Sequence, residues 1–305
     1  MAEAAPAAGV YGDPPRALAP SHGGVQFSPT ALDGARLEDA PDGSLDEITV
    51  LAPPGTIERR YVLAQALRAL RPAGRLVAMA PKTRGGARLG AELEAFGCEV
   101  NERAKAHHRI CHCPRPEAPV GIAEAIAAGA LQIAPGLGLW SQPGLFSWDR
   151  IDPGSALLIS ASDPFTGAGV DVGCGYGVLS RRVLESPAVS SLLLIDIDRR
   201  AIDASKRNVD DPRARFLHAD ARDALAAFKD LDFAVINPPF HAGGREDRDL
   251  GRELVSAAAG SLRRGGLCRV VANVALPYEA AMAQDFAAVR QVARQGGFKV
   301  LEGRR

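Results

Sequence analysis

The sequence predicts an α/β fold in which a mostly parallel sheet of seven strands is covered by helices on both faces. Two observations lead to this prediction. From residue 169 onward, short apolar runs alternate regularly with segments of helical periodicity. A glycine-rich turn, Gly173 to Gly177, separates the first of these strands from the first helix. Because parallel strands need a crossover between them, regularly alternating strands and helices indicate a parallel sheet between two helical layers.

The apolar pattern locates each element of this half. The expected strands comprise residues 169–172, 191–196, 214–218, 233–236 and 267–274, followed by two closing strands. The expected helices comprise residues 178–184, 199–207, 223–228, 250–262 and 278–286. Pro238 and Pro239 end the fourth strand abruptly, because proline cannot donate a hydrogen bond to a neighbouring strand.

Length and charge limit the classes of protein to which this chain can belong. The chain has 305 residues, which suits two domains better than one. Its formal net charge is zero, which does not by itself indicate a nucleic-acid-binding protein. Residues 51–120 nevertheless hold ten Arg and two Lys against six Glu, and a basic segment of this kind attracts phosphate groups. An ordinary solvated surface explains the same charges, so both interpretations stay open.

The cysteines and the N-terminus indicate the compartment. Five cysteines in a chain of this length indicate reduced thiols and not a disulfide framework. No signal peptide and no stretch long and apolar enough for a membrane span are recognised. We therefore expect a cytoplasmic protein without membrane contact, acting as a monomer. The spacing of His107, His108, Cys111, His112 and Cys113 fits a strand better than a zinc site, so no metal is expected.

The N-terminal half repeats part of the C-terminal half. Residues 48–54, Ile-Thr-Val-Leu-Ala-Pro-Pro, are similar to residues 233–239, Phe-Ala-Val-Ile-Asn-Pro-Pro. In this copy Ala52 takes the place of Asn237, and no glycine-rich turn precedes it. We therefore expect a degenerate, partial duplicate of the same fold that has no catalytic activity, with residues 1–46 too short and loose for a full copy.

The composition divides the chain into four segments. Residues 1–20, rich in Ala, Pro and Gly, are expected to be a disordered leader. Residues 21–115 are expected to form the degenerate domain and residues 116–140 a linker. Residues 141–305 are expected to form the catalytic domain.

The glycine-rich turn is the first part of a candidate binding site. It reads Asp171-Val-Gly-Cys-Gly-Tyr-Gly177, and its three glycines let the backbone turn tightly and approach a ligand closely. The helix that follows presents free N–H groups to a carboxylate. The spacing Gly-x-Gly-x-Gly differs from the Gly-x-Gly-x-x-Gly of dinucleotide sites. Cys174, within the turn, is interpreted as a small packing residue and not as a nucleophile.

Polar residues also follow the next three strands. Asp196 ends the second strand, where its carboxylate can bind both hydroxyls of a ribose. Asp220 follows the third strand, where it can accept a hydrogen bond from an adenine amino group. Asn237 follows the fourth strand. Because open α/β sheets bind ligands along the carboxyl ends of their strands, these side chains are expected to line one crevice.

The Asn-Pro-Pro-Phe sequence at 237–240 supplies the chemical half of the site. Its two prolines form a rigid corner that offers the Asn237 amide oxygen and the Asn237 and Pro238 backbone carbonyls as acceptors. Such acceptors can hold a flat amino group by both hydrogens, and Phe240 can stack on the attached ring. The corner therefore indicates chemistry on a planar amino group.

These motifs together resemble the class I S-adenosylmethionine-dependent methyltransferases. In particular, residues 140–305 resemble the ribosomal RNA guanine-N2 methyltransferases that modify the small subunit and their large-subunit relatives. The resemblance is carried by Phe146-Ser147, Asp152-Pro-Gly154, Asp171-Val-Gly-Cys-Gly-Tyr-Gly177, Asn237-Pro-Pro-Phe-His-Ala-Gly243, Val271-Ala-Asn273, Leu276-Pro-Tyr-Glu279 and Phe298-Lys-Val300. That family also carries an inactive N-terminal duplicate, as the internal repeat suggests here.

The resemblance implies a class I methyltransferase fold, S-adenosylmethionine as cofactor, and ribosomal RNA or the small ribosomal subunit as partner. It implies N2 methylation of a guanine, most simply in 16S rRNA. Asn237, Pro238, Pro239 and Phe240 would form the catalytic corner. The cofactor would be bound by residues of the turn and of the strand ends: Asp171, Gly173, Cys174, Gly175, Gly177, Asp196, Ile197, Asp220, Ala221 and Asn237.

Other functions keep part of this chemistry. The same corner would serve a methyltransferase acting on guanine of 23S rRNA, on adenine N6 of nucleic acid or on a protein glutamine. A non-catalytic RNA-binding assembly factor with a vestigial fold is a further alternative. The intact glycines and Asn237 argue against that last interpretation.

Overall fold

The computed structural model describes residues 7–20, 23–239 and 245–305, with the backbone alone for residues 245–248. The chain divides into two compact units. Unit 1 comprises Met1–Leu131 with Gln142–Gly144, and unit 2 comprises Gln132–Ser141 with Leu145–Arg305. Among the described residues, no helix is both long and apolar enough to cross a membrane.

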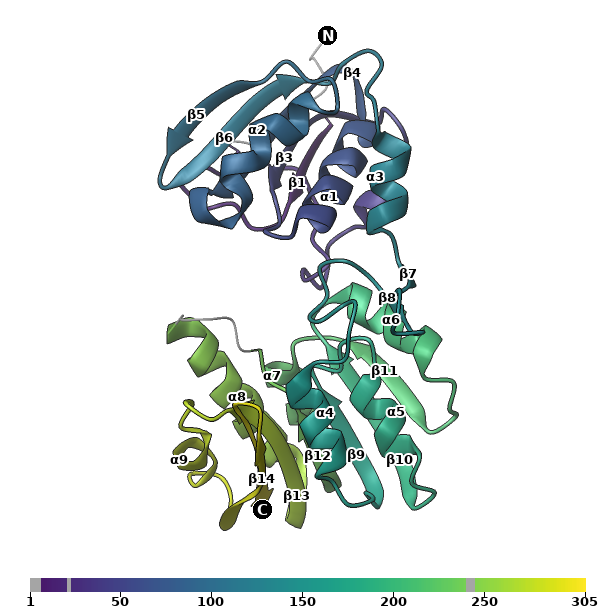
Figure 1. Ribbon diagram of the computed structural model, residues 1–305, viewed down its shortest axis with the longest axis vertical. Helices are drawn as coiled ribbons and strands as arrows, with labels where there is room; N and C mark the ends of the chain where they lie inside the picture. The colour runs from purple at the N-terminus through teal and green to yellow at the C-terminus, as the bar shows by residue number, and fades with distance from the viewer. Residues whose placement is uncertain (1–6, 21–22, 240–244) are drawn as a thin grey trace. The chain divides into compact units, whose positions relative to one another are not determined.

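Unit 2 is built on a seven-stranded sheet. Its strands are β9 (Gly167–Val172), β10 (Val189–Asp196), β11 (Ala214–His218), β12 (Leu231–Ile236), β13 (Leu262–Asn273), β14 (Ala288–Gln295) and β15 (Phe298–Arg304). Their order is β11-β10-β9-β12-β13-β15-β14 (Figure 1). Only β15 runs antiparallel to its neighbours in this sheet. This arrangement confirms the predicted fold class.

Helices cover both faces of this sheet. They are α4 (Pro153–Ser160), α5 (Val178–Leu184), α6 (Arg199–Asn208), α7 (Ala221–Ala224), α8 (Arg245–Ser261) and α9 (Tyr278–Met282), with a short 3-10 helix at Leu225–Ala227. Alternate residues of β12 face opposite helical layers. Ala234 and Ile236 pack in the cluster that includes α8 and α9, whereas Phe233 and Val235 pack in the cluster that includes α5 and α6. The strand is therefore apolar throughout, as a parallel strand buried on both faces requires.

The pairing of β9 with β12 positions the candidate site. The two strands are parallel, and Val172 pairs with Ile236 at their carboxyl ends. The residues that follow, Gly173 and Asn237, therefore leave the sheet side by side. Further back along the strands, a Cβ on Gly169 would lie 2.2 Å from the Phe233 ring, so only glycine allows this close packing.

Unit 1 repeats this strand arrangement. Its strands are β1 (Ala8–Tyr11), β2 (Val25–Gln26), β3 (Leu45–Leu51), β4 (Leu70–Pro81), β5 (Asn101–Lys105) and β6 (His108–Pro114), in the order β2-β1-β3-β4-β6-β5. The helices are α1 (Thr56–Ala69), α2 (Ala87–Glu94) and α3 (Ile122–Gly129), with short 3-10 and π segments at Leu37–Asp39 and Lys82–Gly86. Strands β1, β3, β4, β6 and β5 correspond in order and direction to β9, β12, β13, β15 and β14. The predicted internal duplication is confirmed.

A shared ion pair fixes how the two copies align. Asp46 of unit 1 pairs with Arg71 and accepts a hydrogen bond from the Ala7 N–H at 2.7 Å. Asp232 of unit 2 pairs with Arg263 and accepts from the Ala168 N–H at 2.8 Å. These carboxylates tie the amino ends of equivalent strands together in both units.

This alignment corrects one sequence inference by one residue. Leu45 pairs with Leu70 and Leu51 with Met79 in unit 1, as Leu231 pairs with Leu262 in unit 2. Counting from these pairs, the residue equivalent to Asn237 is Leu51, so the assignment of Ala52 was wrong. The error came from matching Pro53-Pro54 with Pro238-Pro239, because the strand pairing sets these two proline pairs one residue apart. The conclusion that this copy lacks the asparagine is unchanged.

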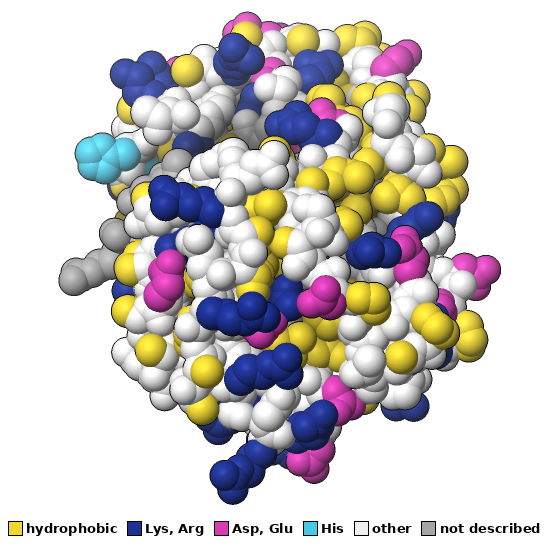
Figure 2. Space-filling view, turned by 60° about the horizontal axis from the view of Figure 1, so that its bottom comes forward, with side chains coloured by type: hydrophobic (Ala, Val, Ile, Leu, Met, Phe, Trp, Pro, Cys, Tyr) yellow, Lys and Arg dark blue, Asp and Glu magenta, His cyan; other side chains and the backbone are white. Residues whose placement is uncertain are grey.

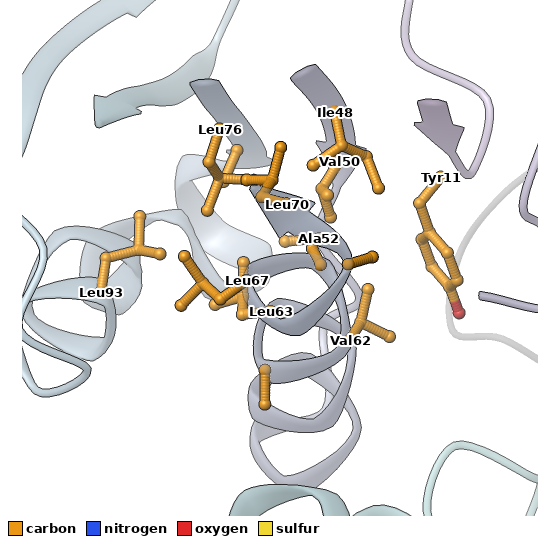
Figure 3. Close-up of a cluster of buried hydrophobic side chains, with 14 of the residues drawn as sticks. Tyr11, Ile48, Val50, Ala52, Val62, Leu63, Leu67, Leu70, Leu76 and Leu93 are labelled. Carbon is orange, nitrogen blue, oxygen red and sulfur yellow. The ribbon is translucent and has the colours of Figure 1, made fainter. Parts of the chain in front are cut away.

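The prediction of a disordered leader at residues 1–20 is wrong for the part that forms β1. Ala8–Tyr11 pairs in parallel with β3 and also with β2. Tyr11 joins the buried cluster that contains Ile48 and Val62, and its ring lies at one side of that cluster (Figure 3). Residues 1–46 therefore contribute two strands to the duplicate, and the composition hid them because the apolar run is only four residues long. Residues 1–6 lie outside the described part of the chain.

The expected linker at residues 116–140 contains a helix that belongs to unit 1. Helix α3 packs against α1, and a Cβ on Gly129 would lie 2.3 Å from the Tyr61 Cβ. The Ala- and Gly-rich sequence looks flexible, but its small side chains are what allow the two helices to approach. Beyond it, β7 (Gln132–Ile133) and β8 (Trp140–Ser141) form a two-stranded sheet that belongs to unit 2.

An arginine fills the corner of unit 1 that corresponds to the Asn-Pro-Pro corner. The Arg59 guanidinium donates hydrogen bonds to the backbone carbonyls of Pro53 and Pro54 at 3.1 and 2.7 Å. It also forms a bidentate ion pair with Glu92, with N···O distances of 2.6 and 2.7 Å. Arg59 is 1% exposed. Two backbone carbonyls of this corner are therefore already bonded within unit 1.

We expect Glu92→Ala to destabilise unit 1 by roughly 3–5 kcal/mol, because it leaves the Arg59 charge buried and uncompensated. Hydrogen–deuterium exchange of peptides from α1, measured in the full chain, would report the loss. The matched control is Arg75→Met, which breaks an exposed pair with Glu47 and should change stability by less than about 1 kcal/mol. Equal exchange in the two variants would contradict a stabilising role for the buried pair.

Candidate active site

The glycine-rich turn leaves open space beside its backbone. Gly173, Gly175 and Gly177 have φ angles of 70°, 54° and 88°. These values lie in the left-handed region, which residues other than glycine rarely adopt. A Cβ on Gly173 or Gly175 would meet no atom within 4 Å, whereas one on Gly177 would lie 3.0 Å from Val209. The first two glycines therefore face a space that a ligand can fill, and the third allows α5 to pack closely.

Asp196 holds the turn in this shape. Its carboxylate accepts hydrogen bonds from the Gly175 N–H at 2.9 Å and from the Asp198 N–H at 2.8 Å. Burial raises the pKa of Asp196 to about 6. The side chain thus lies beside the turn as the sequence predicts, and its contact with a ribose stays a prediction.

Asp171 lies beneath the turn and is fully buried. Ser180 of α5 donates a hydrogen bond to its Oδ2 at 2.6 Å, and its buried Oδ1 has no partner among the described residues. Burial raises the pKa of Asp171 to about 7. Cys174, also buried, belongs to an apolar cluster, as the packing interpretation predicts, and burial raises its pKa.

The carboxylate of Asp220 already accepts hydrogen bonds from within the protein, which the sequence does not indicate. It caps α7, and the Arg222 side chain and backbone N–H donate to its carboxylate at 2.6 to 3.1 Å. This arginine lowers the pKa of Asp220. The side chain of Ile197, next to Asp196, is 41% exposed and offers an apolar surface, whereas Ala221 is buried.

Asn237 has a definite orientation. Its Nδ2 donates to Asp152 Oδ2 at 3.1 Å and to Ser155 Oγ at 2.8 Å. Its Oδ1 is buried and has no partner among the described residues. Pro238 is buried beside it and Pro239 is half-buried. The amide oxygen is therefore a buried acceptor for which the described residues provide no donor, and such a group calls for an explanation.

Asp152 and Ser155 contact Asn237 and were not among the site residues predicted from the sequence. Asp152 is the N-cap of α4 and accepts the Ser155 N–H at 2.8 Å. An Asp followed by Pro before an apolar run signals a helix start, and that signal was present. Their contact with Asn237 joins residues more than 80 positions apart, which spacing alone does not reveal.

Three further groups of residues that the sequence singled out can be compared with the structure: Phe240, the candidate zinc residues and the arginines of the basic segment. Phe240 lies outside the described residues, so its stacking role stays a prediction. The candidate zinc residues fall on β6 and the turn before it, which confirms the interpretation of this segment as a strand. Among the residues of the basic segment, Arg84 and Arg88 are exposed, whereas Arg109 forms an ion pair with Glu102.

The charges of the molecule are locally balanced. Figure 2 shows Lys and Arg side chains interspersed with Asp and Glu on the face turned toward the viewer. In unit 2, Arg263 pairs with Asp232 and Arg290 pairs with Glu302.

The comparisons with known proteins agree with this geometry. Residues 136–302 match the model of a family described as methyltransferase small domain. The ribosomal RNA small subunit methyltransferase C of Stutzerimonas stutzeri is 31% identical over 268 residues, which cover 86% of this chain and 80% of that protein. Its namesake from Pseudomonas paraeruginosa is 32% identical over 278 residues, covering 87% and 81%.

A solved structure has the same fold over the whole chain. It is described as the T. thermophilus 16S rRNA N2 G1207 methyltransferase in complex with AdoMet and guanosine. The match has a TM-score of 0.79 at 24% identity and covers 100% of this chain and 90% of that one. The predicted family resemblance is confirmed. The chain belongs to the ribosomal RNA small subunit methyltransferase C family, with its methyltransferase small domain at residues 136–302.

Proposed function

We propose that this protein transfers a methyl group from S-adenosylmethionine to the exocyclic N2 amino group of a guanine in 16S rRNA. The observation that carries the proposal is the buried, unpartnered Oδ1 of Asn237 beside the glycine-rich turn. The relatives named above act on small-subunit ribosomal RNA by their printed names. The cytoplasmic location and monomeric state expected from the sequence stay predictions.

The residues along the strand ends fit S-adenosylmethionine. The open space at Gly173 and Gly175 suits a ligand pressed against the backbone. Asp196 has a carboxylate suited to ribose hydroxyls, and exposed Ile197 offers apolar surface to a flat base. When bound, the cofactor supplies an electrophilic methyl group.

Asn237 and Pro238 supply the acceptors for the target amine. The lone pair of the guanine amino group is delocalised into the ring, which makes it a poor nucleophile. Acceptance of both amine hydrogens, by Asn237 Oδ1 and the Pro238 carbonyl, helps to localise that lone pair and aims it at the methyl group. Orientation of the two reactants then provides much of the rate. No strong base is needed, because the amine proton can leave during or after transfer.

The target base has to be unpaired or turned out of its stack, which costs a few kcal/mol. Stacking on an aromatic ring returns about 1–3 kcal/mol, and Phe240 is the residue we propose for this role. Exposed Arg84 and Arg88 of unit 1 are available for phosphate contacts, whereas Arg109 is neutralised by Glu102.

Asn237→Ala should lower methyl transfer to 16S rRNA by at least about 100-fold, because it removes an acceptor that acts on the reacting amine. Transfer from labelled S-adenosylmethionine, followed by nucleoside mass spectrometry of the product, measures both the rate and the base. Asn101→Ala, an amide removed from exposed β5, should behave as wild type. Undiminished transfer by Asn237→Ala, or a product other than N2-methylguanosine, would refute the assignment.

Gly175→Arg should abolish measurable binding of S-adenosylmethionine by calorimetry, because its side chain would occupy the open space beside the turn. Gly296→Arg is the matched control: its φ is 58°, a Cβ there also meets nothing within 4 Å, and it lies in the β14–β15 turn. The control separates backbone strain from loss of the ligand space. Retention of binding by Gly175→Arg would show that the cofactor lies elsewhere.

The affinity for S-adenosylmethionine should rise with pH between about 5 and 7 and then level off. The reason is the pKa of Asp196, about 6, because only the ionised carboxylate accepts hydrogen bonds from both ribose hydroxyls. Calorimetry across this pH range tests the effect, and Asp196→Asn should flatten the lower part of the curve. A wild-type affinity independent of pH would argue against this role of Asp196.

A further inference from the structure

We propose that Asp152 and Ser155 are positioning residues that fix the Asn237 amide with its carbonyl oxygen facing the target amine. The proposal rests on the proposed function for the identity of that amine. It assigns a task to α4, a segment outside the glycine-rich turn and the Asn-Pro-Pro corner.

The two contacts select one of two amide orientations. An asparagine amide can turn by about 180° and exchange its oxygen with its NH2 group at little cost in packing. An ionised carboxylate accepts hydrogen bonds and donates none, so the NH2 group must face Asp152 Oδ2, 3.1 Å away. In the turned orientation, two oxygens would lie at that distance without a proton between them. Ser155 Oγ, at 2.8 Å, provides a second acceptor on the same side.

Asp152 is itself held in place. Its Oδ2 accepts the Ser155 N–H at 2.8 Å as the N-cap of α4, and its side chain is 8% exposed. A Cβ on Gly154 would lie 2.9 Å from that same oxygen and 3.0 Å from the Phe298 ring. The sequence Asp-Pro-Gly-Ser therefore builds a rigid acceptor: proline starts the helix, glycine leaves room, and the first turn holds the carboxylate.

The consequence is a buried oxygen, Asn237 Oδ1, that has no hydrogen-bond partner in the described part of the chain. An unsatisfied buried acceptor destabilises a fold, so its retention calls for an explanation. Unit 1 shows the alternative, because Leu51 takes the position of Asn237 and Arg59 bonds the nearby proline carbonyls. In unit 2 the Asn237 Oδ1 has no partner among the described residues, and it follows the strand beside the one that leads to Gly173 and Gly175.

The first test observes the amide in the protein without ligand. The Nδ2 signals of Asn237 can be assigned in ¹⁵N-labelled protein by their loss in Asn237→Ala. We expect Ser155→Ala and Asp152→Ala each to move these signals toward the shifts of an exposed asparagine, because each removes an acceptor of the Asn237 NH2 group. Ser261→Ala and Asp232→Asn are the controls, since each alters a hydrogen-bonded side chain of unit 2 away from this edge. Unchanged Asn237 signals in both test variants would overturn the proposal.

The second test is a double-mutant cycle on methyl transfer to 16S rRNA. Asp152→Ala, which removes the acceptor, should lower kcat by about 10- to 100-fold and Ser155→Ala by about 3- to 10-fold. The affinity for S-adenosylmethionine, measured by calorimetry, should stay near that of the wild type. In the Asn237→Ala background both substitutions should have little further effect, because they act through the amide. Losses that multiply with that of Asn237→Ala would assign the two residues a role independent of Asn237 and overturn the proposal.

Asn237→Asp provides a further check, because it places two carboxylates in contact and should lower methyl transfer strongly. Transfer by this variant at the wild-type rate would count against the proposal. If the wild type itself does not methylate 16S rRNA, the proposed function fails, whereas the amide signals still test the orientation separately.

Discussion

The parallel pairing of β9 with β12 is the contact on which the candidate site depends. It joins strands that are separated along the chain by three helical connections, and it aligns Val172 with Ile236 at the carboxyl ends of the two strands. The glycine-rich turn and the Asn-Pro-Pro corner follow directly from these two residues. One part of the site suits a ligand pressed against the backbone, and the other offers acceptors to an amine. Neither part would be useful if the register differed by one residue, because every following side chain would change face.

A comparison of the two duplicated units shows which features the candidate site needs in addition to the shared strand order. Both units share the strand order and the Asp–Arg pair at the amino ends of their strands. In unit 1 the corner is closed by Arg59, which satisfies the carbonyls and pairs with buried Glu92. In unit 2 the amide oxygen of Asn237 has no partner among residues 7–20, 23–239 and 245–305. The same framework therefore serves stability in one copy, and in the other it leaves polar groups available to a ligand.

The sequence was sufficient for the parts of the fold that periodicity and turn residues encode. Helix α5 and strand β11 have the predicted bounds, since each is delimited by residues with clear preferences. Strand β1 and helix α3 were missed, because a four-residue strand and an Ala–Gly-rich helix resemble flexible chain by composition. In the site, the glycines and Asp196 were found from their order along the chain. The support that Asp152 gives to Asn237 could not be found, because it depends on how α4 packs across the end of the sheet.

The orientation of one amide therefore connects the fold to the proposed chemistry. A structure of the protein with S-adenosylhomocysteine and guanosine tests this connection most directly. The account predicts that Asn237 Oδ1 lies about 3 Å from the guanine N2, while Nδ2 keeps its contacts with Asp152 and Ser155. A guanine bound with N2 directed away from Asn237, or an amide oxygen turned toward Ser155, would contradict it.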